Sequence, residues 1–375
     1  MSKSKICHLT SVHPRYDTRI YLKECSSLAK ENYYVSLIVA DGKGNEQING
    51  IQILDVGKLK GRLNRMLKTT RLIFKEAVKQ DASIYHLHDP ELLPVALKLK
   101  KIGKIVVFDS HEDFPKQILS KSYLNKHVRK SLSFFISLYE NFVCKKLDAI
   151  VTATPFIRNK FLTINPQSID INNYPILGEL DTENLPSNTK TNKICYVGGI
   201  TSIRGIAQVV KALEYTTSDA RLQLVGNFRE SAVEKSVKKL KGWNKVEQLG
   251  FLNRTEVKEL FAESVLGLVT FLPFPNHIDA QPNKMFEYMS AGIPVISSNF
   301  TLWRQIIEGN ECGICVDPFD SEAIAQAIDK LMSESTLAKK MGNNGRTAVI
   351  SLYNWAVEEQ KLFNLYRELQ AKQIK

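Results

Sequence analysis

The chain has 375 residues, 43% of them hydrophobic and 24% charged, the composition of a globular protein long enough for two domains. Its net charge of +12 comes from residues 1–175, which hold 28 Lys and Arg against 16 Asp and Glu, whereas residues 176–375 hold 23 of each. No run of 18 apolar residues and no secretory signal pattern occurs, so we expect neither a membrane span nor export, and we expect a cytoplasmic protein.

Short apolar runs in the first half alternate with helical patterns. We expect strands at residues 6–9, 34–39, 83–86, 105–109 and 149–153, and helices at residues 20–30, 90–101 and 126–145. Strand, helix, strand is the unit of a parallel sheet, and continuous hydrophobic strands are typical of a sheet covered on both faces. The first half therefore predicts an α/β, doubly wound domain over residues 1–175.

Two basic stretches in this half carry interleaved apolar residues. Residues 58–79 hold eight basic side chains and one acidic, Glu76, and a second stretch spans residues 116–146. This composition suits an anionic membrane surface, although two solvated helices with apolar undersides in the core are the alternative. Because no nucleic-acid motif occurs, we expect no nucleic-acid partner. The basic stretches lead us to expect peripheral contact with the inner face of the membrane.

A polar segment, residues 176–192, follows and is expected to be a linker, after which the strand and helix rhythm restarts. A second domain is predicted over residues 193–350, and residues 351–375 form an amphipathic C-terminal helix expected to pack back towards the first domain. The expected strands lie at residues 193–197, 221–225, 246–249, 266–270, 295–298 and 313–316, and the helices at residues 206–213, 231–241, 255–264 and 321–333.

The six cysteines are scattered, which fits reduced thiols. Cys312 and Cys315 form a CxxC pair, but a lone pair is weak evidence for zinc, and its apolar setting is typical of a strand interior.

Polar loops follow the strands of the first half, where ligands bind in open α/β sheets. The loop over residues 11–20 contains no GxGxxG, which counts against a dinucleotide-binding dehydrogenase. Two loops rich in histidine and carboxylate follow, residues 86–90 and 109–113. Metal binding is an alternative for these loops, through His86, His88, Asp109 and His111, but adjacent strand residues point to opposite faces, so only some of these side chains could converge.

In the second half a strand opens into Gly198 and Gly199, and Arg204 precedes a helix. The two glycines would let the backbone approach a ligand, and a guanidinium group near a helix N-terminus suits a diphosphate. The alternative is a plain glycine turn with Arg204 in solvent. The strand-then-glycine pattern recurs at residues 224–227 and 249–252.

Residues 281–298 are the most informative segment of the second half. Pro282 can begin a helix, Gly292 and Pro294 end it, and residues 295–298 read as a buried strand. The helix presents free N–H groups to an anion and carries Glu287 inside it, although an ordinary helix with a solvated Glu287 is the alternative.

Taken together and in order, these motifs resemble the retaining glycosyltransferases of family 4. The resemblance covers essentially the whole chain and implies the GT-B fold, two Rossmann-like doubly wound domains facing each other across a cleft. The motifs that carry it are residues 13–20, His88-Asp89-Pro90, residues 109–113, Asn173-Tyr174-Pro175, residues 198–205, Leu249-Gly250 and residues 282–295.

The resemblance also implies roles for individual residues. Glu287 matches the second glutamate of the family's E-x7-E motif, which clamps ribose hydroxyls, and Arg204 stands in the place of a phosphate-binding lysine. His111 is similar to the family's histidine near the donor sugar. The sequence departs from the family at Asp279, where the first glutamate is expected, and at Gly199, where an arginine is expected.

The expected site thus has a donor part and an acceptor part. We expect the donor to be held by Gly198, Gly199, Asn227, Leu252, Pro282, Asn283 and Lys284, beside His111, Arg204, Glu287 and Asp279. We expect the acceptor side to include His13, Asp17, Arg19, His88 and Asp89.

The predicted activity is transfer of a hexosyl or N-acetylhexosaminyl group from a nucleotide sugar, first UDP-linked, to a lipid-linked glycan in surface polysaccharide synthesis, such as lipopolysaccharide. No cofactor or metal is expected, because Arg204 and a helix N-terminus would stabilise the departing diphosphate. A sugar-nucleotide 2-epimerase of the same fold and a non-catalytic glycan-binding protein are the alternatives.

Overall fold

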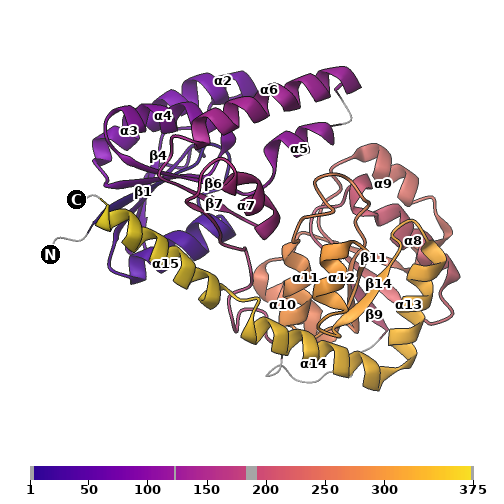
Figure 1. Cartoon of the computed structure of the whole chain (residues 1–375). Helices are drawn as coiled ribbons and strands as arrows, with labels where there is room; N and C mark the ends of the chain where they lie inside the picture. The colour runs from indigo at the N-terminus through magenta and orange to yellow at the C-terminus, as the bar shows by residue number, and fades with distance from the viewer. Residues whose placement is uncertain (1–3, 122–123, 183–191, 373–375) are drawn as a thin grey trace. The chain divides into compact units, whose positions relative to one another are not determined.

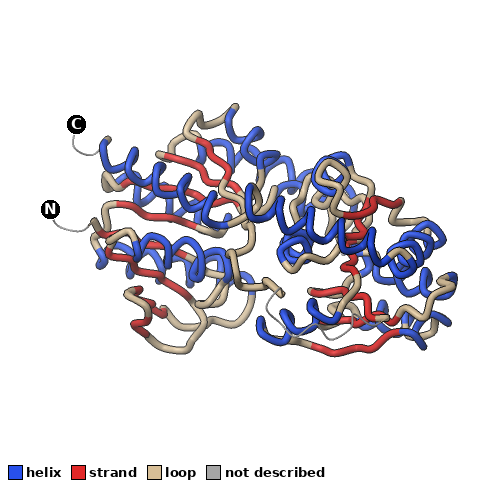
Figure 2. The backbone as a smooth tube through the Cα atoms, turned by 90° about the horizontal axis from the view of Figure 1, so that it is seen from below, coloured by secondary structure: helices blue, strands red, loops and turns tan. Residues whose placement is uncertain are grey.

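The computed structural model describes residues 4–121, 124–182 and 192–372. The chain divides into two compact units (Figure 1). Unit 1 comprises Met1–Asn173 together with Val357–Lys375, and unit 2 comprises Tyr174–Ala356. Figure 2 shows how strands and helices alternate within each unit.

Unit 1 is built on an eight-stranded sheet of order β3-β4-β2-β1-β5-β6-β7-β8, parallel except for the pair β3–β4. Its strands are β1 (Lys5–Leu9), β2 (Tyr34–Val39), β3 (Glu46–Ile48), β4 (Ile51–Asp55), β5 (Ile84–Leu87), β6 (Ile105–Ser110), β7 (Ala149–Thr152) and β8 (Ser168–Asp170). The central strands β5, β6 and β7 are buried throughout, because helices cover both faces of the sheet.

Helices connect these strands in unit 1. They are the π-helical segment η1 (Thr18–Cys25), α1 (Ser26–Lys30), α2 (Arg62–Asn64), η2 (Arg65–Thr69), α3 (Thr70–Gln80), η3 (Pro90–Leu92), α4 (Leu93–Lys101), α5 (Phe114–Leu119), α6 (Lys126–Cys144), α7 (Pro155–Leu162) and α15 (Trp355–Ala371). Asp17 begins η1 by accepting from the backbone N–H groups of Arg19 and Ile20. From Val357 onward, α15 belongs to unit 1.

Unit 2 is a six-stranded parallel sheet of order β11-β10-β9-β12-β13-β14. Its strands are β9 (Lys193–Val197), β10 (Arg221–Val225), β11 (Val246–Gly250), β12 (Leu266–Val269), β13 (Val295–Ser298) and β14 (Gly313–Val316). Its helices are η4 (Ser202–Arg204), α8 (Ile206–Tyr215), α9 (Ser231–Val237), η5 (Lys241–Lys245), α10 (Arg254–Glu263), α11 (Asn283–Ser290), α12 (Thr301–Ile307), α13 (Ser321–Ser333) and α14 (Ser335–Ser351).

Helix α11 begins after Pro282 and ends before Gly292, whose φ of 68° only glycine adopts readily. The Tyr288 ring packs where a side chain on Gly267 of β12 would stand, since a Cβ there would lie 2.4 Å from the ring. The Tyr288 hydroxyl accepts the N–H of Val197 at 3.0 Å. Helix α11 is therefore fixed to the carboxyl end of β9, where the glycine loop starts.

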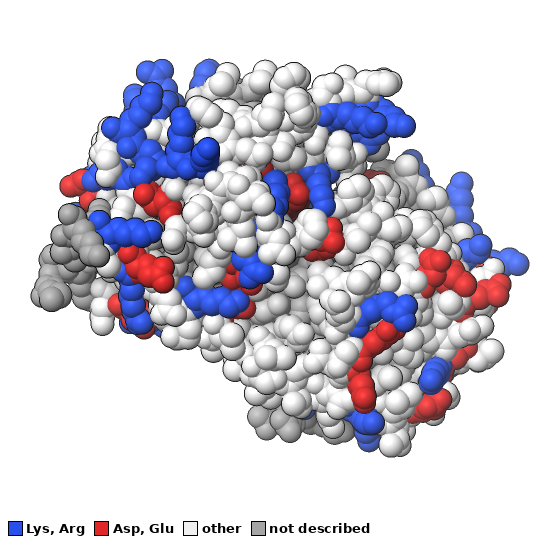
Figure 3. All heavy atoms as spheres, in the orientation of Figure 1, with Lys and Arg blue, Asp and Glu red and all other residues white. Residues whose placement is uncertain are grey.

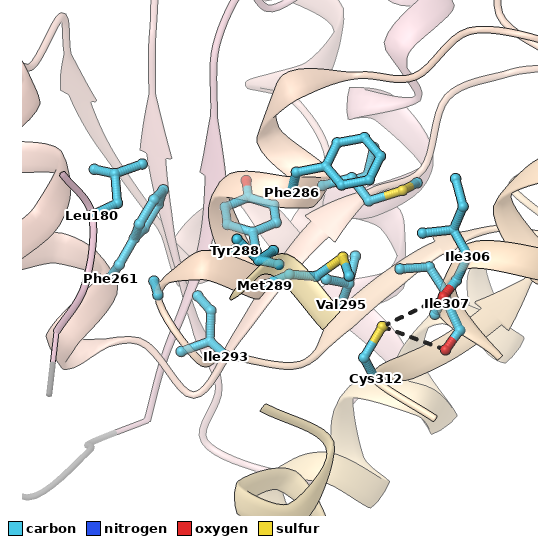
Figure 4. Packing of buried hydrophobic residues seen from close by; sticks show 14 of the residues in the cluster. Leu180, Phe261, Phe286, Tyr288, Met289, Ile293, Val295, Ile306, Ile307 and Cys312 are labelled. Carbon is cyan, nitrogen blue, oxygen red and sulfur yellow. Dashed lines mark hydrogen bonds between the residues drawn. The ribbon is translucent and has the colours of Figure 1, made fainter. Parts of the chain in front are cut away.

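The core of unit 2 contains Cys312, whose thiol faces the carbonyls of Ile306 and Ile307 at 3.8 and 3.4 Å (Figure 4). Burial raises the pKa of this thiol to about 12. Cys315 contacts Ser297 instead, with Sγ and Oγ 3.2 Å apart. The two sulfurs of the CxxC pair thus have separate partners, and both cysteines are free thiols.

The described part of the segment expected to be a linker is packed into unit 2 instead. Residues 176–182 belong to unit 2, and Leu180 is fully buried in the unit 2 core, because its side chain completes the apolar surface beside Phe261. Residues 183–191 of that segment lie outside the described residues. Among the residues that the structure describes, no helix is both long and apolar enough to cross a bilayer.

Candidate active site

Three glycine loops meet at the carboxyl edge of the unit 2 sheet. Gly198 donates its N–H to the carbonyl of Val225 at 2.9 Å, and Gly226 donates to the carbonyl of Gly250 at 2.6 Å. A Cβ on Gly226 would lie 2.1 Å from the carbonyl oxygen of Gly198, so only glycine permits this close approach. The strand-then-glycine pattern expected after β9, β10 and β11 is therefore one continuous backbone surface.

Three cations surround the first of these loops, and we call Arg204, Arg229 and Lys284 the cationic cluster. Arg204 donates from Nη1 to the carbonyl of Gly199 at 3.1 Å. A Cβ on Gly199 would lie 3.1 Å from Arg204 Nη1 and 3.3 Å from Arg229 Nε, and one on Gly198 would lie 3.4 Å from Lys284 Nζ. The glycines thus let positive groups close on the backbone, an arrangement suited to phosphate.

Lys284 is the most unusual member of the cationic cluster. Its side chain is buried, its Nζ has no hydrogen-bond partner among the described residues, and it lies 3.6 Å from the centre of the Tyr196 ring. Burial, and then the charge of Arg204, lower the pKa of Lys284 well below its usual range. A buried and unpaired ammonium group costs free energy, and an anion bound at this loop would offset that cost.

Glu287, one turn further along α11, faces a different partner. Its Oε1 accepts from Arg254 Nη1 at 2.8 Å, and Arg254 also holds Glu179 with Nε and Nη2, at 2.7 and 3.0 Å. For Oε2 of Glu287 the described residues offer no partner, so this oxygen can accept from a hydroxyl group. Arg254 was missed by sequence reasoning, because it lies 33 residues before Glu287.

The other expected donor residues lie in the loops after β10 and β11, at the start of α11 and in the turn before it. Asn227 is exposed in the loop after β10, and its carbonyl accepts the N–H of Ile200 at 3.2 Å. Leu252 is half-buried against the core of unit 2, and Asn283 is exposed at the start of α11. Asp279 lies in the turn before α11, half-buried, outside the helix that carries Glu287.

In unit 1 the expected acceptor-side loops do converge. His13 Nδ1 lies 3.2 Å from Asp17 Oδ2, and His13 Nε2 lies 3.4 Å from Asp89 Oδ1. The rings of His13 and His111 are 4.8 Å apart between centroids, and both side chains are partly exposed. Burial alone would lower the pKa of His13, but Asp17 and then Asp89 raise it above its usual value.

Beneath these groups lies a buried pair, Arg19 and Asp109. Arg19 donates from Nε and Nη2 to the two carboxylate oxygens of Asp109, at 2.8 and 2.9 Å, and from Nη1 to the carbonyl of Ile171 at 2.7 Å. Burial alone would raise the pKa of Asp109, but Arg19, and then His111, hold it well below its usual range. Asp109 is therefore an ionised acceptor inside unit 1.

This burial corrects part of the acceptor-side prediction. Arg19, His88 and Asp89 are each at least 97% buried, and their polar atoms are bonded within unit 1, so they support the site rather than face a ligand. Asp89, for example, accepts from the N–H of Ser11 at 2.6 Å. The partly exposed residues His13, Asp17 and His111 are the ones that can meet a ligand.

The metal alternative can be tested on donor geometry. In the part of the chain that the structure describes, two groups offer ligand atoms within 4.8 Å of one another: His8, Glu24, His86 and His88, and His88, Asp109 and His111. In the first group, His8 Nδ1 and His88 Nε2 are 2.9 Å apart, with ring planes within 13° and centroids 5.1 Å apart, so these nitrogens point at each other. In the second, both Asp109 oxygens already accept from Arg19. Both geometries suit hydrogen bonding better than a shared cation.

The two units, each a mainly parallel α/β sheet with polar loops at its carboxyl edge, define the GT-B class of glycosyltransferase. The model for Glycosyltransferase Family 4 matches residues 19–171, and the model for Glycosyl transferases group 1 matches residues 179–348. The chain belongs to glycosyltransferase family 4.

Relatives and solved structures agree with this assignment. The capsular polysaccharide biosynthesis glycosyltransferase CapM of Staphylococcus aureus is 22% identical over 395 residues, which cover 98% of this chain and 97% of CapM. Sucrose-phosphate synthase of Thermosynechococcus elongatus has the same fold, with a TM-score of 0.80 at 18% identity, over 99% of this chain and 100% of that one. HepE of Anabaena, solved with UDP-glucose, has a TM-score of 0.74 at 14% identity, over 98% of this chain and 99% of that one.

Proposed function

We propose that this glycosyltransferase moves a hexosyl or N-acetylhexosaminyl group from a UDP-sugar to a glycan acceptor, with retention at the anomeric carbon. The observation that carries the donor proposal is the cationic cluster, in which a buried Lys284 without a partner faces the same glycine loop as Arg204. HepE, which shares the fold, binds UDP-glucose, and CapM acts in capsular polysaccharide synthesis. A surface polysaccharide is accordingly the proposed product.

In this proposal the leaving diphosphate lies over Gly198 and Gly199. Arg204 and Lys284 neutralise its developing charge, together with the free N–H groups at the start of α11. Arg229, whose Nε would lie 3.3 Å from a Cβ on Gly199, is proposed to supply the positive charge of the arginine that the family has at that position. Because these cations supply positive charge at the diphosphate, we propose that transfer needs no metal.

Glu287 and His111 would orient the rest of the donor. Oε2 of Glu287 is free to accept from a ribose hydroxyl while Arg254 holds Oε1. His111, whose Nε2 lies 2.9 Å from Asp109, is proposed to contact the donor sugar. His13 and Asp17, on the partly exposed side of unit 1, are proposed to meet the acceptor.

We further propose that unit 1 contacts an anionic membrane surface, where a lipid-linked acceptor would lie. Leu63, Leu67, Phe134 and Phe135 are each at least 60% exposed on α2, η2 and α6, among basic side chains. Lys and Arg gather along the upper edge of unit 1, with few acidic side chains between them (Figure 3). Exposed apolar residues beside cations are what interfacial binding requires.

One experiment tests the activity. Purified protein is incubated with radiolabelled UDP-glucose, UDP-N-acetylglucosamine or GDP-mannose and a bacterial lipid extract, and lipid and soluble products are separated. Labelled lipid supports transfer, conversion of the free nucleotide sugar indicates the epimerase, and neither product indicates a binding protein. Arg304→Ala is the control variant. Transfer by Arg204→Ala and Glu287→Ala at the level of this control would contradict the proposed donor site.

A further inference from the structure

A chain of buried polar side chains runs through unit 1 from its C-terminal helix to His111. Its members come from four segments, β1, the end of β5, the end of β6 and α15. They are Tyr366, His8, His88, Asp109 and His111. The first four are at least 99% buried, and only His111 reaches the surface.

Successive contacts along this chain are short. The Tyr366 hydroxyl lies 3.4 Å from His8 Nε2, and His8 Nδ1 lies 2.9 Å from His88 Nε2. His88 Nδ1 lies 3.2 Å from Asp109 Oδ2, and His111 Nε2 lies 2.9 Å from the same oxygen. Each ring nitrogen between Tyr366 and Asp109 therefore has a neighbour.

The ionised carboxylate of Asp109 fixes the hydrogens nearest to it in the chain. A carboxylate can only accept, so His88 Nδ1, which is hydrogen-bonded to Asp109, must carry a hydrogen. His88 Nδ1 and His111 Nε2 also lie 3.3 Å apart, so the alternative is that His111 Nε2 accepts from His88. That alternative would turn a lone pair towards the ionised carboxylate at 2.9 Å, and the repulsion between them favours a hydrogen on His111 Nε2. Buried deep in the unit, His88 is neutral, since burial lowers its pKa to about 4.

The remaining protons then follow. With Nδ1 protonated, His88 Nε2 accepts, and the hydrogen between the two rings belongs to His8 Nδ1. Burial lowers the pKa of His8 as well, so His8 Nε2 accepts from the Tyr366 hydroxyl. Tyr366 in turn accepts from His86 Nδ1 at 2.8 Å.

The opposite hydrogen-bond direction at Tyr366 leaves more buried ring nitrogens without partners. If its hydroxyl donated to His86 Nδ1, the buried Nε2–H of His86 and the Nε2 lone pair of His8 would both lack partners. In the assignment above, His86 Nε2 is the one ring nitrogen of these three histidines left unbonded. Fewer unsatisfied buried groups favour it.

We propose that Tyr366, acting through His8, His88 and Asp109, is a positioning residue that holds His111 with Nε2–H on Asp109 and Nδ1 turned to the substrate. The role of His111 in transfer rests on the proposed function, whereas the tautomers do not. The C-terminal helix is thereby part of the machinery that orients the sugar-facing side chain. A change in α15 would reach the site through these bonds.

The test uses the full chain labelled with ¹⁵N in its histidines, with ring signals assigned by single His→Gln variants. Long-range proton–nitrogen spectra at pH 7.5 should show His8 and His88 as Nδ1–H tautomers and His111 as the Nε2–H tautomer. His111 found as Nδ1–H, or His88 found as Nε2–H, would overturn the proposal. These spectra need no substrate and no activity.

Tyr366→Phe tests the far end of the chain, and Tyr33→Phe is the matched control, since Tyr33 contacts the same helix through Gln370. In Tyr366→Phe the His8 Nε2 signal should move, and kcat should fall about fivefold at unchanged donor KM, as expected for one neutral hydrogen bond. Tyr33→Phe should match wild type in the His8 Nε2 signal and in kcat. Wild-type spectra and kcat in Tyr366→Phe would contradict the proposal, whereas absent transfer in wild type would count against the proposed function alone.

Discussion

Arg254 holds Glu287 in place: Nη1 donates to Oε1 at 2.8 Å, while its other nitrogens bind Glu179. The carboxylate therefore keeps one oxygen fixed and one available. A glutamate free to rotate would lose conformational entropy on meeting a ribose hydroxyl, and Arg254 removes that cost in advance.

Removing Arg254 should therefore weaken donor binding. Arg254→Ala is expected to raise the Kd for UDP-glucose roughly tenfold, the loss of one charge-assisted hydrogen bond, measured by calorimetry. Arg254→Lys should recover little, because an ammonium cannot bind both Glu179 and Glu287 as a fork does. Arg304→Ala, which breaks an exposed pair with Glu308, is the control. Equal affinity in Arg254→Ala and the control would show that Glu287 needs no support.

Lys284 should take up a proton when a diphosphate binds. Its pKa lies well below the usual value in the free protein, and a bound anion would raise it. UDP affinity should then fall as pH rises from the free to the bound pKa, and calorimetry in buffers of different ionisation heat should detect proton uptake. Lys284→Met should abolish that uptake and weaken UDP binding roughly 10- to 100-fold. Proton uptake that persists in Lys284→Met would assign it to another group.

The strands of both sheets could largely be predicted from sequence, because buried parallel strands are continuous apolar runs. The short strands β3 and β8 were missed, since three residues carry no pattern. Strand β4 was missed because exposed Gln52 interrupts its apolar residues. Helix α14 was missed because Asn343, Asn344 and two glycines read as a loop.

The close packing of helix α14 requires glycine in its sequence. A Cβ on Gly342 would lie 2.1 Å from the carbonyl oxygen of Gly292, so the close approach of the helix overrides low helix propensity. The site follows the same rule. Sequence motifs pointed to Arg204 and Lys284 of the cationic cluster and to the histidine loops, but not to Arg229. Arg254 and Tyr366 have partners 33 and 358 residues away, which no local pattern reveals.

Gly267 should be intolerant of even a methyl group. Gly267→Ala would press on the Tyr288 ring, and overpacking of this kind costs about 1–3 kcal/mol of the free energy of unfolding. All three tryptophans lie in unit 2, so their fluorescence during urea unfolding reports on it. In a double-mutant cycle, Gly267→Ala should cost much less beside Tyr288→Leu. Additive costs would show that the ring is not what restricts this position.

Acid should loosen unit 1 before unit 2. His8, His86 and His88 have lowered pKa values in the folded state, so the unfolded chain binds more protons once pH falls below about 6.5. For His88, with a folded pKa of about 4, the loss between pH 7.5 and pH 5 is roughly 2 kcal/mol. The buried carboxyl of Glu24, whose pKa burial and Asp109 raise, and His13, whose pKa Asp17 raises, oppose this trend.

Amide hydrogen exchange distinguishes the two units in this experiment. Peptides covering β1, β5 and β6 should lose protection on going from pH 7.5 to pH 5, after correction for the intrinsic exchange rate, while those covering β9 and β12 should lose less, because His277 is the one histidine of lowered pKa in unit 2. Glu24→Gln removes one of the opposing groups and should enlarge the loss in unit 1. Equal losses in both units would contradict a histidine origin.

The proposed contact of unit 1 with an anionic membrane can be tested with lipid vesicles. Flotation with vesicles containing anionic lipid should recover the protein, and neutral vesicles should not, because the attraction is worth about 1 kcal/mol per basic residue near the surface. Arg62, Lys68 and Arg71, all exposed on α2, η2 and α3, can be reversed together to Glu, which should abolish recovery. Lys235, Lys239 and Lys241 of unit 2, reversed in the same way, are the matched control. Replacing exposed Phe134 and Phe135 by Ser should weaken binding even at low salt, because the rings supply the apolar part of the contact. Equal recovery of both triple variants would mean that net charge, and not this surface, attracts the vesicles.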